Sequence, residues 1–264
     1  MKGEKVKNMK KMKNAIIAIG MTVLTFGMAG TAKAGILDSL QVRAHAGYSM
    51  GGTTPIPLPE SIRSIDSYRL TPSFMVGFDA MLPLNGKWGI TAGLHYENKA
   101  MKADVTTKAY HMEVVKGGSH ITGLFTGHVS QKVTQWMLTV PVQVTLELGG
   151  KVVLRGGPYV SFLLSKEFSG IASDGYLREG NPTGAKILMG DKEGEWATYE
   201  FDDDMRSLQV GIGIGADWQV YKRFGVSADL NWGLTGIFPG DFKTVEQTLY
   251  PIYGTIGVFY RLSR

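Results

Sequence analysis

The sequence predicts an all-β fold, an eight-stranded antiparallel up-and-down transmembrane β-barrel with long extracellular loops. Three observations carry this prediction: eight segments alternate apolar and polar residues, their connections alternate in length, and the chain begins with an export signal. In the clearest segment, 135–147, every even position carries a large apolar residue, whereas most odd positions are polar. A soluble sandwich also alternates in this way, so the connections and the export signal decide between the two folds.

The first 34 residues are predicted to be a secretory signal peptide. Six lysines lie within the first 13 residues, an apolar run follows at 15–30, and Ala32, Lys33 and Ala34 form a small-residue cleavage site. The run is shorter than the roughly 20 residues that a spanning helix needs. We expect cleavage after Ala34, which leaves residues 35–264 as the outer-membrane β-barrel domain.

Removal of the signal changes the charge of the chain. Seven of the 28 basic and one of the 23 acidic residues lie in residues 1–34, so 21 basic and 22 acidic residues remain and the net charge falls near −1. The argument from charge to nucleic-acid binding disappears with the signal. The chain contains no cysteine, which excludes disulfides, a lipoprotein anchor and a cysteine nucleophile.

Eight strands follow in order, each predicted from one run of alternation. Most have the roughly 9 to 11 residues that a tilted strand needs to cross a bilayer. The predicted strands are 40–48, 68–81, 88–97, 135–147, 152–165, 207–220, 224–234 and 251–262.

The connections between these strands differ in length from one rim to the other. Short turns are predicted at 83–87, 148–150 and 221–223, and Asn85-Gly86 suits a tight hairpin. Long polar connections are predicted at 49–67, 98–134, 166–206 and 235–250. Four long loops on one rim, opposite three short turns and both termini, are typical of an eight-stranded outer-membrane barrel.

The even-numbered face is predicted to contact lipid, and it carries aromatic residues near both ends of the strands. The predicted short-turn girdle consists of Trp88, Trp218, Phe224 and Tyr260. The predicted long-loop girdle consists of Tyr48, Tyr68, Tyr96, Trp136, Phe162 and Trp232. Aromatic residues favour strands in general, but two girdles separated by aliphatic residues favour a membrane barrel.

Several segments give the chain a family resemblance. They are the signal peptide, the fifth-strand segment 157–164 (GPYVSFLL), the sixth-strand segment 211–217 (GIGIGAD), Gly233-Leu234-Thr235, and the closing segment 257–262 (GVFYRL). In these features the chain resembles the PorT-like family of small outer-membrane β-barrels of Gram-negative bacteria. The resemblance covers essentially all of the mature chain and implies the barrel fold and an envelope location.

The odd-numbered face is predicted to line a narrow lumen, where an isolated charge costs several kcal/mol. We therefore expect a polar network in which three arginines oppose five carboxylates. Its predicted members are Arg43, His45, Asp79, His95, Glu97, Glu147, Arg155, Asp217, Asp229 and Arg261. Because side chains fill the interior of an eight-stranded barrel, we expect no water-filled pore.

The sequence gives only weak indications of a catalytic or metal-binding site. His95 and Glu97 share one face, and His45 lies on another strand, but no serine elbow or lipase-like motif marks a nucleophile. Three further histidines in 98–134 have spacings of nine and eight, which match no ligand pattern. We expect no catalytic residue, no cofactor and no metal site.

The two longest loops differ in charge. Segment 98–134 has five lysines and two acids, whereas 166–206 has ten acids and five bases. One hypothesis is that the two loops pair with each other and form a cap over the barrel mouth, and another is that Asp202-Asp203-Asp204 collects divalent cations. The interpretation we favour is that the charged residues of both loops are simply solvated. Segments 110–115 and 120–125 flank a turn at 116–119, which predicts a ribbon whose edge can recruit a partner strand.

The predicted protein is an integral outer-membrane barrel with a side-chain-filled lumen and a structural or binding role. Its expected partners are outer-membrane lipid, lipopolysaccharide and an extracellular or envelope protein that contacts the long loops, and we expect a monomer that binds no nucleic acid. Three alternatives stay open: a small-solute or lipid channel, an envelope lipid-modifying enzyme, and a soluble periplasmic ligand-carrying barrel. The soluble barrel requires the reverse polarity of the two faces.

Overall fold

The computed structural model describes residues 39–242, 244–245 and 248–263. The chain divides into two units, Met1–Leu40 and Gln41–Arg264. The predicted signal peptide, residues 1–34, lies outside the described residues. All the strands below belong to the second unit, and among the described residues no helix has the length and apolar character needed to cross a membrane.

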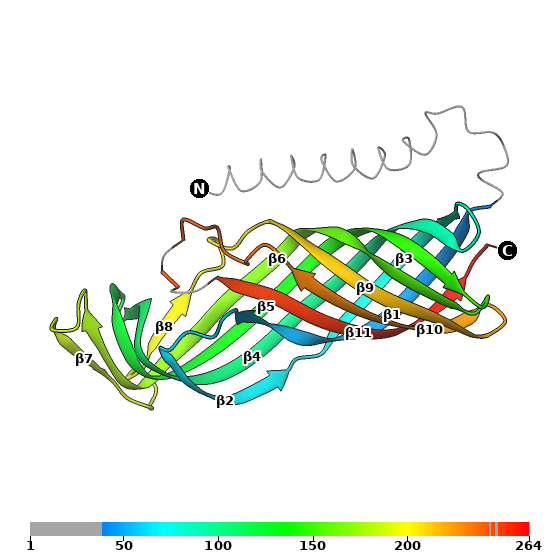
Figure 1. The fold of residues 1–264 in the computed structure, drawn as a ribbon. Helices are drawn as coiled ribbons and strands as arrows, with labels where there is room; N and C mark the ends of the chain where they lie inside the picture. Colours follow the sequence, from blue (N-terminus) through cyan, green and yellow to red (C-terminus); the bar gives the residue numbers. More distant parts are fainter. Residues whose placement is uncertain (1–38, 243, 246–247, 264) are drawn as a thin grey trace, which may run out of the picture. The chain divides into compact units, whose positions relative to one another are not determined.

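The described part of the chain forms eight long strands and three short ones (Figure 1). The long strands are β1 (Gln41–Pro55), β3 (Ser73–Pro83), β4 (Trp88–Lys116), β5 (Ser119–Leu148), β6 (Val152–Glu179), β9 (Leu208–Tyr221), β10 (Phe224–Gly233) and β11 (Leu249–Arg261). The short strands are β2 (Ile62–Leu70), β7 (Lys186–Met189) and β8 (Ala197–Glu200).

The eight long strands close into one antiparallel ring. Neighbours in the ring run β1-β3-β4-β5-β6-β9-β10-β11, and β11 pairs back with β1. The closing ladder extends from Arg43 opposite Arg261 to Pro55 opposite Leu249. The predicted eight-stranded antiparallel barrel is therefore confirmed.

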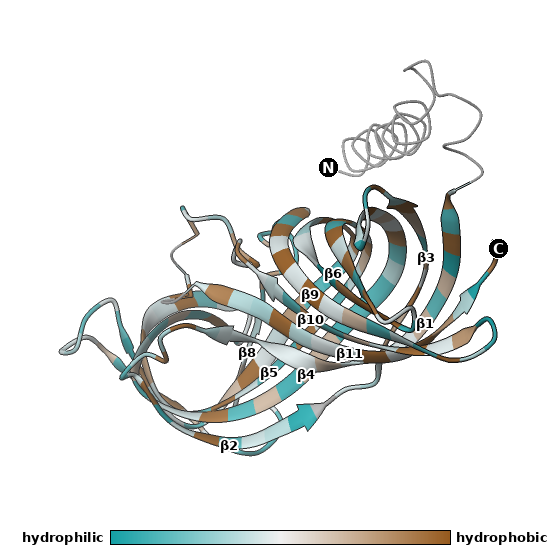
Figure 2. Ribbon diagram, turned by 45° about the vertical axis from the view of Figure 1, so that its right-hand side comes forward, coloured by the Kyte–Doolittle hydropathy of each residue, from teal (hydrophilic) through white to brown (hydrophobic). Residues whose placement is uncertain are grey.

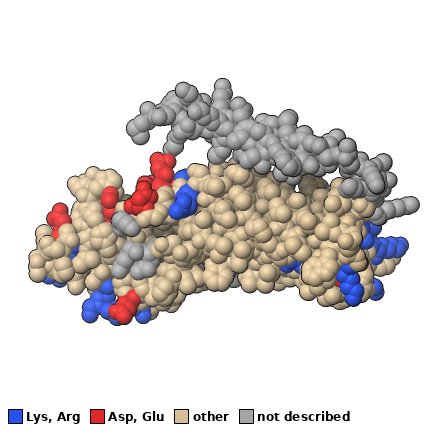
Figure 3. Space-filling view, turned by 45° about the horizontal axis from the view of Figure 1, so that its top comes forward, with Lys and Arg blue, Asp and Glu red and all other residues tan. Residues whose placement is uncertain are grey.

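The two faces of the ring have opposite polarity, as the alternation predicts. Large apolar side chains such as Phe78, Ile214 and Ile256 are about 60% exposed on the outside, whereas buried Arg43, Asp79 and Asp217 point inward. The hydropathy colours alternate along single strands (Figure 2). On the face shown in Figure 3, charged residues gather at the two ends of the barrel and leave most of the band between them uncharged. A surface of this kind fits a bilayer rather than water.

Three strands extend much further than the sequence predicts. β4, β5 and β6 contain 29, 30 and 28 residues, and β4 pairs with β5 up to the turn between Lys116 and Ser119. The predicted hairpin and ribbon in 98–134 are therefore confirmed, whereas the predicted ends of these three strands at residues 97, 135 and 165 are wrong. Beyond the bilayer the alternation weakens, because side chains on both faces meet either water or loops.

The predicted strand 68–81 is also wrong at its start. The structure divides this segment into β2, which pairs with β4, and β3, which pairs with β1 and β4. The break falls at Thr71 and Pro72. Proline has no N–H to donate to a ladder, which explains why pairing stops there.

The extensions build a packed structure that we call the head. It comprises β2, β7, β8, residues 101–116 of β4, 119–133 of β5 and 166–179 of β6, with the loop residues that pack on them. Its core includes the buried side chains of Val114, Phe125, Phe168, Leu177 and Ile237. β8 pairs with both β4 and β6, so the second and third long loops meet through strand pairing, as the cap hypothesis requires. Figure 1 shows the head at the end of the barrel opposite the C-terminus.

This topology predicts which sites a membrane-impermeant thiol reagent reaches in intact cells. Because the chain has no cysteine, single exposed cysteines can be placed by Ser119→Cys and Asn181→Cys in the head and by Asn85→Cys and Lys151→Cys in the short turns. We expect labelling of the two head sites in intact cells, and of the turn sites only after the outer membrane is permeabilised. Labelling of Asn85→Cys in intact cells would contradict this orientation.

Candidate functional site in the barrel lumen

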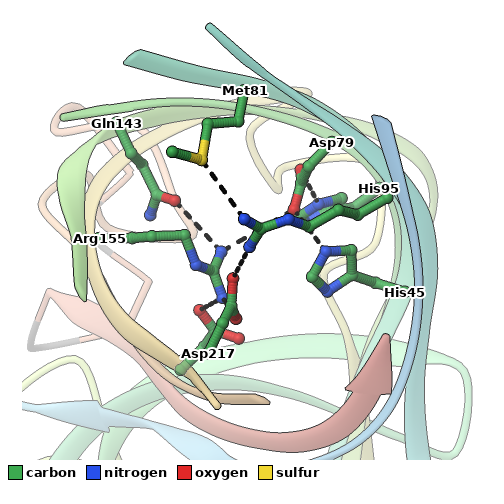
Figure 4. Close-up of polar contacts among 9 residues, drawn as sticks. His45, Asp79, Met81, His95, Gln143, Arg155 and Asp217 are labelled. Carbon is green, nitrogen blue, oxygen red and sulfur yellow. Dashed lines mark hydrogen bonds and ion pairs between the residues drawn. The ribbon is translucent and has the colours of Figure 1, made fainter. Parts of the chain in front are cut away.

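The centre of the lumen is a buried ion-pair network around Asp217 on β9. Arg43 of β1 contacts one Asp217 oxygen at 2.8 Å, and Arg155 of β6 contacts the other at 2.8 Å. Arg155 also lies 2.9 Å from Asp229 of β10. The Asp217 carboxylate thus joins two arginines from different strands, and the guanidinium group of Arg155 joins two carboxylates. Figure 4 shows Arg155 and Asp217 facing each other in the lumen.

A second part of the network surrounds Asp79 on β3. One Asp79 oxygen lies 3.0 Å from His45 Nε2, and the other lies 2.8 Å from His95 Nε2. Arg155 is 3.9 Å from the same carboxylate and connects the two parts. Figure 4 shows Met81 and Gln143 at the border of this network. Arg43 Nη2 contacts Met81 Sδ at 3.4 Å, and Arg155 Nη1 donates to Gln143 Oε1 at 3.3 Å.

A third polar group lies nearer the head. Glu97 contacts Lys99 Nζ at 3.4 Å and accepts a hydrogen bond from Thr139, whose hydroxyl lies 2.7 Å from that of Ser161. The Lys99 ammonium also lies 5.5 Å from the ring centre of Tyr159 and 5.6 Å from that of Tyr253. A buried lysine is thus held by one carboxylate and two aromatic faces, which is a favourable environment for a desolvated cation.

The ion pairs differ in part from those predicted. Glu97 pairs with Lys99, not with an arginine, because β4 continues inward-facing beyond residue 97 and brings the lysine into the lumen. Glu147 and Arg261 line a cavity of about 50 Å³ at the short-turn end. Among the described residues neither forms an ion pair, so the expected pairing of Arg261 with a carboxylate is wrong.

Sequence reasoning missed Lys99, Gln143, Tyr159 and Tyr253 as lumen residues. All four have odd numbers and lie on strands that face the lumen at odd positions. Parity alone was enough to find Gln143, Tyr159 and Tyr253. Lys99 was missed because the third strand was predicted to end at Glu97.

The predicted girdle residues lie on the outside of the ring, with one exception. Trp88, Trp218 and Phe224 are more than half exposed at the short-turn end, and Phe224 contacts Tyr260 with ring centres 4.8 Å apart. At the other end Tyr48, Tyr96 and Trp232 are exposed and Phe162 is half-buried.

Trp136 organises the long-loop girdle. Its ring stacks on Tyr96 at 5.5 Å and meets the edge of Phe74 at 5.4 Å, and Phe74 is a girdle residue that the sequence analysis omitted. The exception among the predicted residues is Tyr68, which lies on β2 in the head, where its hydroxyl donates to the Gly51 carbonyl.

The loop histidines and aspartates do not converge. His120 lies 2.9 Å from Glu113, and His128 lies 3.3 Å from Asp66, both at exposed positions. Asp202 accepts a hydrogen bond from the Phe168 amide at 2.6 Å. Within the described ranges, no group of three or more potential metal ligands occurs.

A closed antiparallel ring with an apolar band, exposed aromatic residues near both ends of the strands and a polar lumen defines an integral outer-membrane β-barrel. The chain belongs to the outer membrane protein beta-barrel domain family, whose model matches residues 31–239. The protein is thus located in the outer membrane and carries extracellular loops. No curated protein sequence matches it.

Solved structures of several small outer-membrane proteins resemble this fold. Ail of Yersinia pestis, crystallised with the heparin analogue sucrose octasulfate, is 9% identical with a TM-score of 0.40, and the match covers 85% of this chain and 99% of Ail. OprG of Pseudomonas aeruginosa is 11% identical with a TM-score of 0.35, and the match covers 86% of this chain and 98% of OprG. Neisserial surface protein A is 11% identical with a TM-score of 0.35, and the match covers 85% of this chain and 97% of that protein.

The network geometry predicts a large effect of Arg155→Met on stability. The change leaves Asp217 with one partner and removes the ion pair of Asp229, and unpairing a buried charge typically costs about 3–5 kcal/mol. We expect the free energy of unfolding, measured by urea titration in lipid vesicles, to fall by about this amount. Arg223→Met, an exposed turn substitution, is the control and should change it by less than about 0.5 kcal/mol. Equal stabilities of the two variants would contradict the network.

Proposed function

We propose that this protein is a non-catalytic, monomeric, PorT-like binding protein, in which a plugged barrel presents a rigid head to ligands or other envelope proteins. The observation that carries this proposal is the combination of a lumen filled by ion pairs with a head that has its own hydrophobic core. A plugged barrel does not favour transport. A packed head offers a fixed surface, and rigid surfaces lose little conformational entropy on binding.

The outer edge of the head offers a site for a protein partner. β7 pairs with β6, and among the described residues no strand pairs with its other edge. Leu188 on β7 is 67% exposed, which is the highest exposure of any large apolar side chain in the described residues. Exposed strand edges recruit extended segments of other proteins by adding a strand. This edge supports the expected interaction through the long loops.

Lipopolysaccharide is the second expected partner, and a row of cations supports it. Arg69, Lys102 and Lys132 lie directly opposite one another on β2, β4 and β5. Like charges in this position repel one another, so an anion that binds across the row relieves the repulsion. Lys102 lies four residues beyond Asn98, the register partner of Trp136, which is about 13 Å along the strand. At a strand tilt of about 45° this is roughly 9 Å along the membrane normal, just outside the interfacial layer of the bilayer.

Local carboxylates neutralise the row only in part. Lys132 pairs with Glu167 at 2.7 Å, and Arg69 lies 3.4 Å from Asp104 at an exposed position. Hydrogen bonds from Ser130 and Ser67 hold the pKa of Asp104 below its usual range, so this carboxylate is charged at neutral pH. Lys102 is exposed and has no ion-pair partner among the described residues.

The lumen geometry supports a non-catalytic role. The hydroxyl chain of Ser161 and Thr139 ends on the carboxylate of Glu97, which already pairs with Lys99. His45 and His95 contact Asp79 instead of a hydroxyl. Acyl transfer requires a nucleophile within reach of its base. We expect incubation with phospholipid and lipopolysaccharide to leave the masses of both lipids unchanged; a change in mass would favour the enzyme.

The plugged lumen predicts that the protein does not conduct ions. In planar bilayers the full chain should give no steady conductance above that of the bilayer, because a barrel of this size is filled by its side chains. The measurement is single-channel recording with a known porin as the positive control. A steady conductance would contradict the proposal and favour the small-solute channel.

The cation row predicts weaker lipopolysaccharide binding when two charges are removed. Each cation near an anionic surface contributes about 1 kcal/mol, so Arg69→Gln with Lys102→Gln should weaken retention about tenfold or more. The measurement is the amount of lipopolysaccharide that stays bound during purification at increasing salt. The double variant Lys87→Gln with Lys151→Gln, at the opposite rim, is the control. An equal loss of bound lipopolysaccharide in the two double variants would contradict a specific site.

A further inference from the structure

The head contains a cavity of about 440 Å³. Its walls include Met101, Met112, Val129, Phe168, Phe201 and Leu249. The volume falls within the roughly 300–1,000 Å³ of small-molecule sites. The cavity is separate from the lumen network, because the layer of Lys99, Tyr159 and Tyr253 lies below Met101 along the strands.

The chemistry of the walls selects an uncharged, apolar occupant. Among the described residues that line the cavity, none is charged, and the polar ones are mainly threonines and tyrosines, such as Thr53, Thr107 and Tyr110. Empty apolar cavities hold water poorly and accept hydrocarbon instead. A charged or strongly polar ligand would lose its hydration there without a partner.

The side of the head between β1 and β2 is lined by cavity residues from both strands, such as Gly51, Thr53, Ile65 and Tyr68. β1 pairs with β3 only as far as Ser49 opposite Ser73. Beyond that point no described ladder joins β1 to β2, and the hydroxyl of Tyr68 reaches across to the Gly51 carbonyl. Leu58, Ile65 and Tyr68 line the cavity and are 51%, 55% and 44% exposed, so the opening itself is apolar.

The opening lies at the level of the lipid head groups. Gly51 lies three residues beyond the girdle residue Tyr48, which is about 10 Å along the strand and, at a tilt of about 45°, roughly 7 Å along the membrane normal. The interfacial layer of a bilayer extends roughly 5–8 Å beyond the hydrocarbon. An apolar opening at this height faces the outer leaflet rather than the tip of the loops.

We propose that the head binds one acyl chain of an outer-leaflet lipid, which reaches the cavity laterally between β1 and β2 while its head group stays outside. The volume suits one chain and not a whole glycolipid. As the acyl chain leaves the bilayer, the exposed apolar residues at the opening take the place of the lipid hydrocarbon that surrounded it. This site is distinct from the row of Arg69, Lys102 and Lys132 on β2, β4 and β5, which is proposed above to bind lipopolysaccharide.

Photocrosslinking in vesicles tests the site. The full chain is reconstituted in phosphatidylcholine that includes a phosphatidylcholine with a diazirine near the end of one acyl chain, and modified residues are mapped by mass spectrometry after illumination. We expect adducts on Met112 and Val129, which are 3% and 5% exposed and face the cavity. Adducts confined to outward-facing residues such as Val144 and Ile214 would overturn the proposal.

A cavity-filling variant separates occupancy of the cavity from contact with bulk lipid. Ala103→Phe places a ring in the cavity wall and should lower the adducts on Met112 and Val129 at least fivefold. Val144→Phe, on the lipid-facing surface, is the matched control and should leave them unchanged. If Ala103→Phe fails to fold, Val105→Phe fills the same wall. Equal adducts in the filled and control variants would overturn the proposal, as would labelling of Met112 by a water-soluble apolar diazirine but not by the phospholipid.

Discussion

Ring closure is the constraint on which the rest of this structure depends. In the hydrocarbon of a bilayer each unpaired backbone group costs several kcal/mol, so the ladder between β1 and β11 leaves no open edge there. Eight strands enclose a narrow interior, and the period of two places every second residue in it. Charged residues on that face must therefore find partners across the lumen. Asp217 does so by joining Arg43 and Arg155 from two other strands, and loss of either arginine would leave a buried charge without one of its partners.

Above the membrane this constraint no longer applies, and the structure changes at the same height. The pairing of β1 with β3 stops at Ser49, and Pro72 separates β3 from β2 at about the same level. Backbone groups that lose their strand partner at this level can bond to water. β4, β5 and β6 continue together, and β8 connects β4 and β6. The head is thus a continuation of part of the ring, and the gap between β1 and β2 is a direct result of the ring opening.

The sequence predicted the membrane part of the fold well because lipid makes its rules strict. Parity placed Arg43, Asp217 and Arg155 inside and Trp88 and Trp218 outside, and the structure has them there. The head was predicted only as a ribbon, because its strands face water on one side and loops on the other, which weakens the alternation. Lys99 shows the consequence, since ending the third strand at residue 97 removed the partner of Glu97 from the predicted network. The cavity could not be predicted, because its walls come from distant segments.

The layer formed by Lys99, Tyr159 and Tyr253 explains how a plugged barrel and an apolar cavity coexist. On β4 the inward residues run from His95 through Glu97 and Lys99 to Met101, so the environment changes from ionic to apolar within about 20 Å. The Lys99 ammonium group neutralises Glu97 on the lumen side, and the next inward residue of β4, Met101, already lines the apolar cavity. A chain that reaches the cavity therefore meets a closed floor. The same closure that keeps ions out of the apolar cavity keeps an apolar occupant out of the ion pairs, which favours binding over passage.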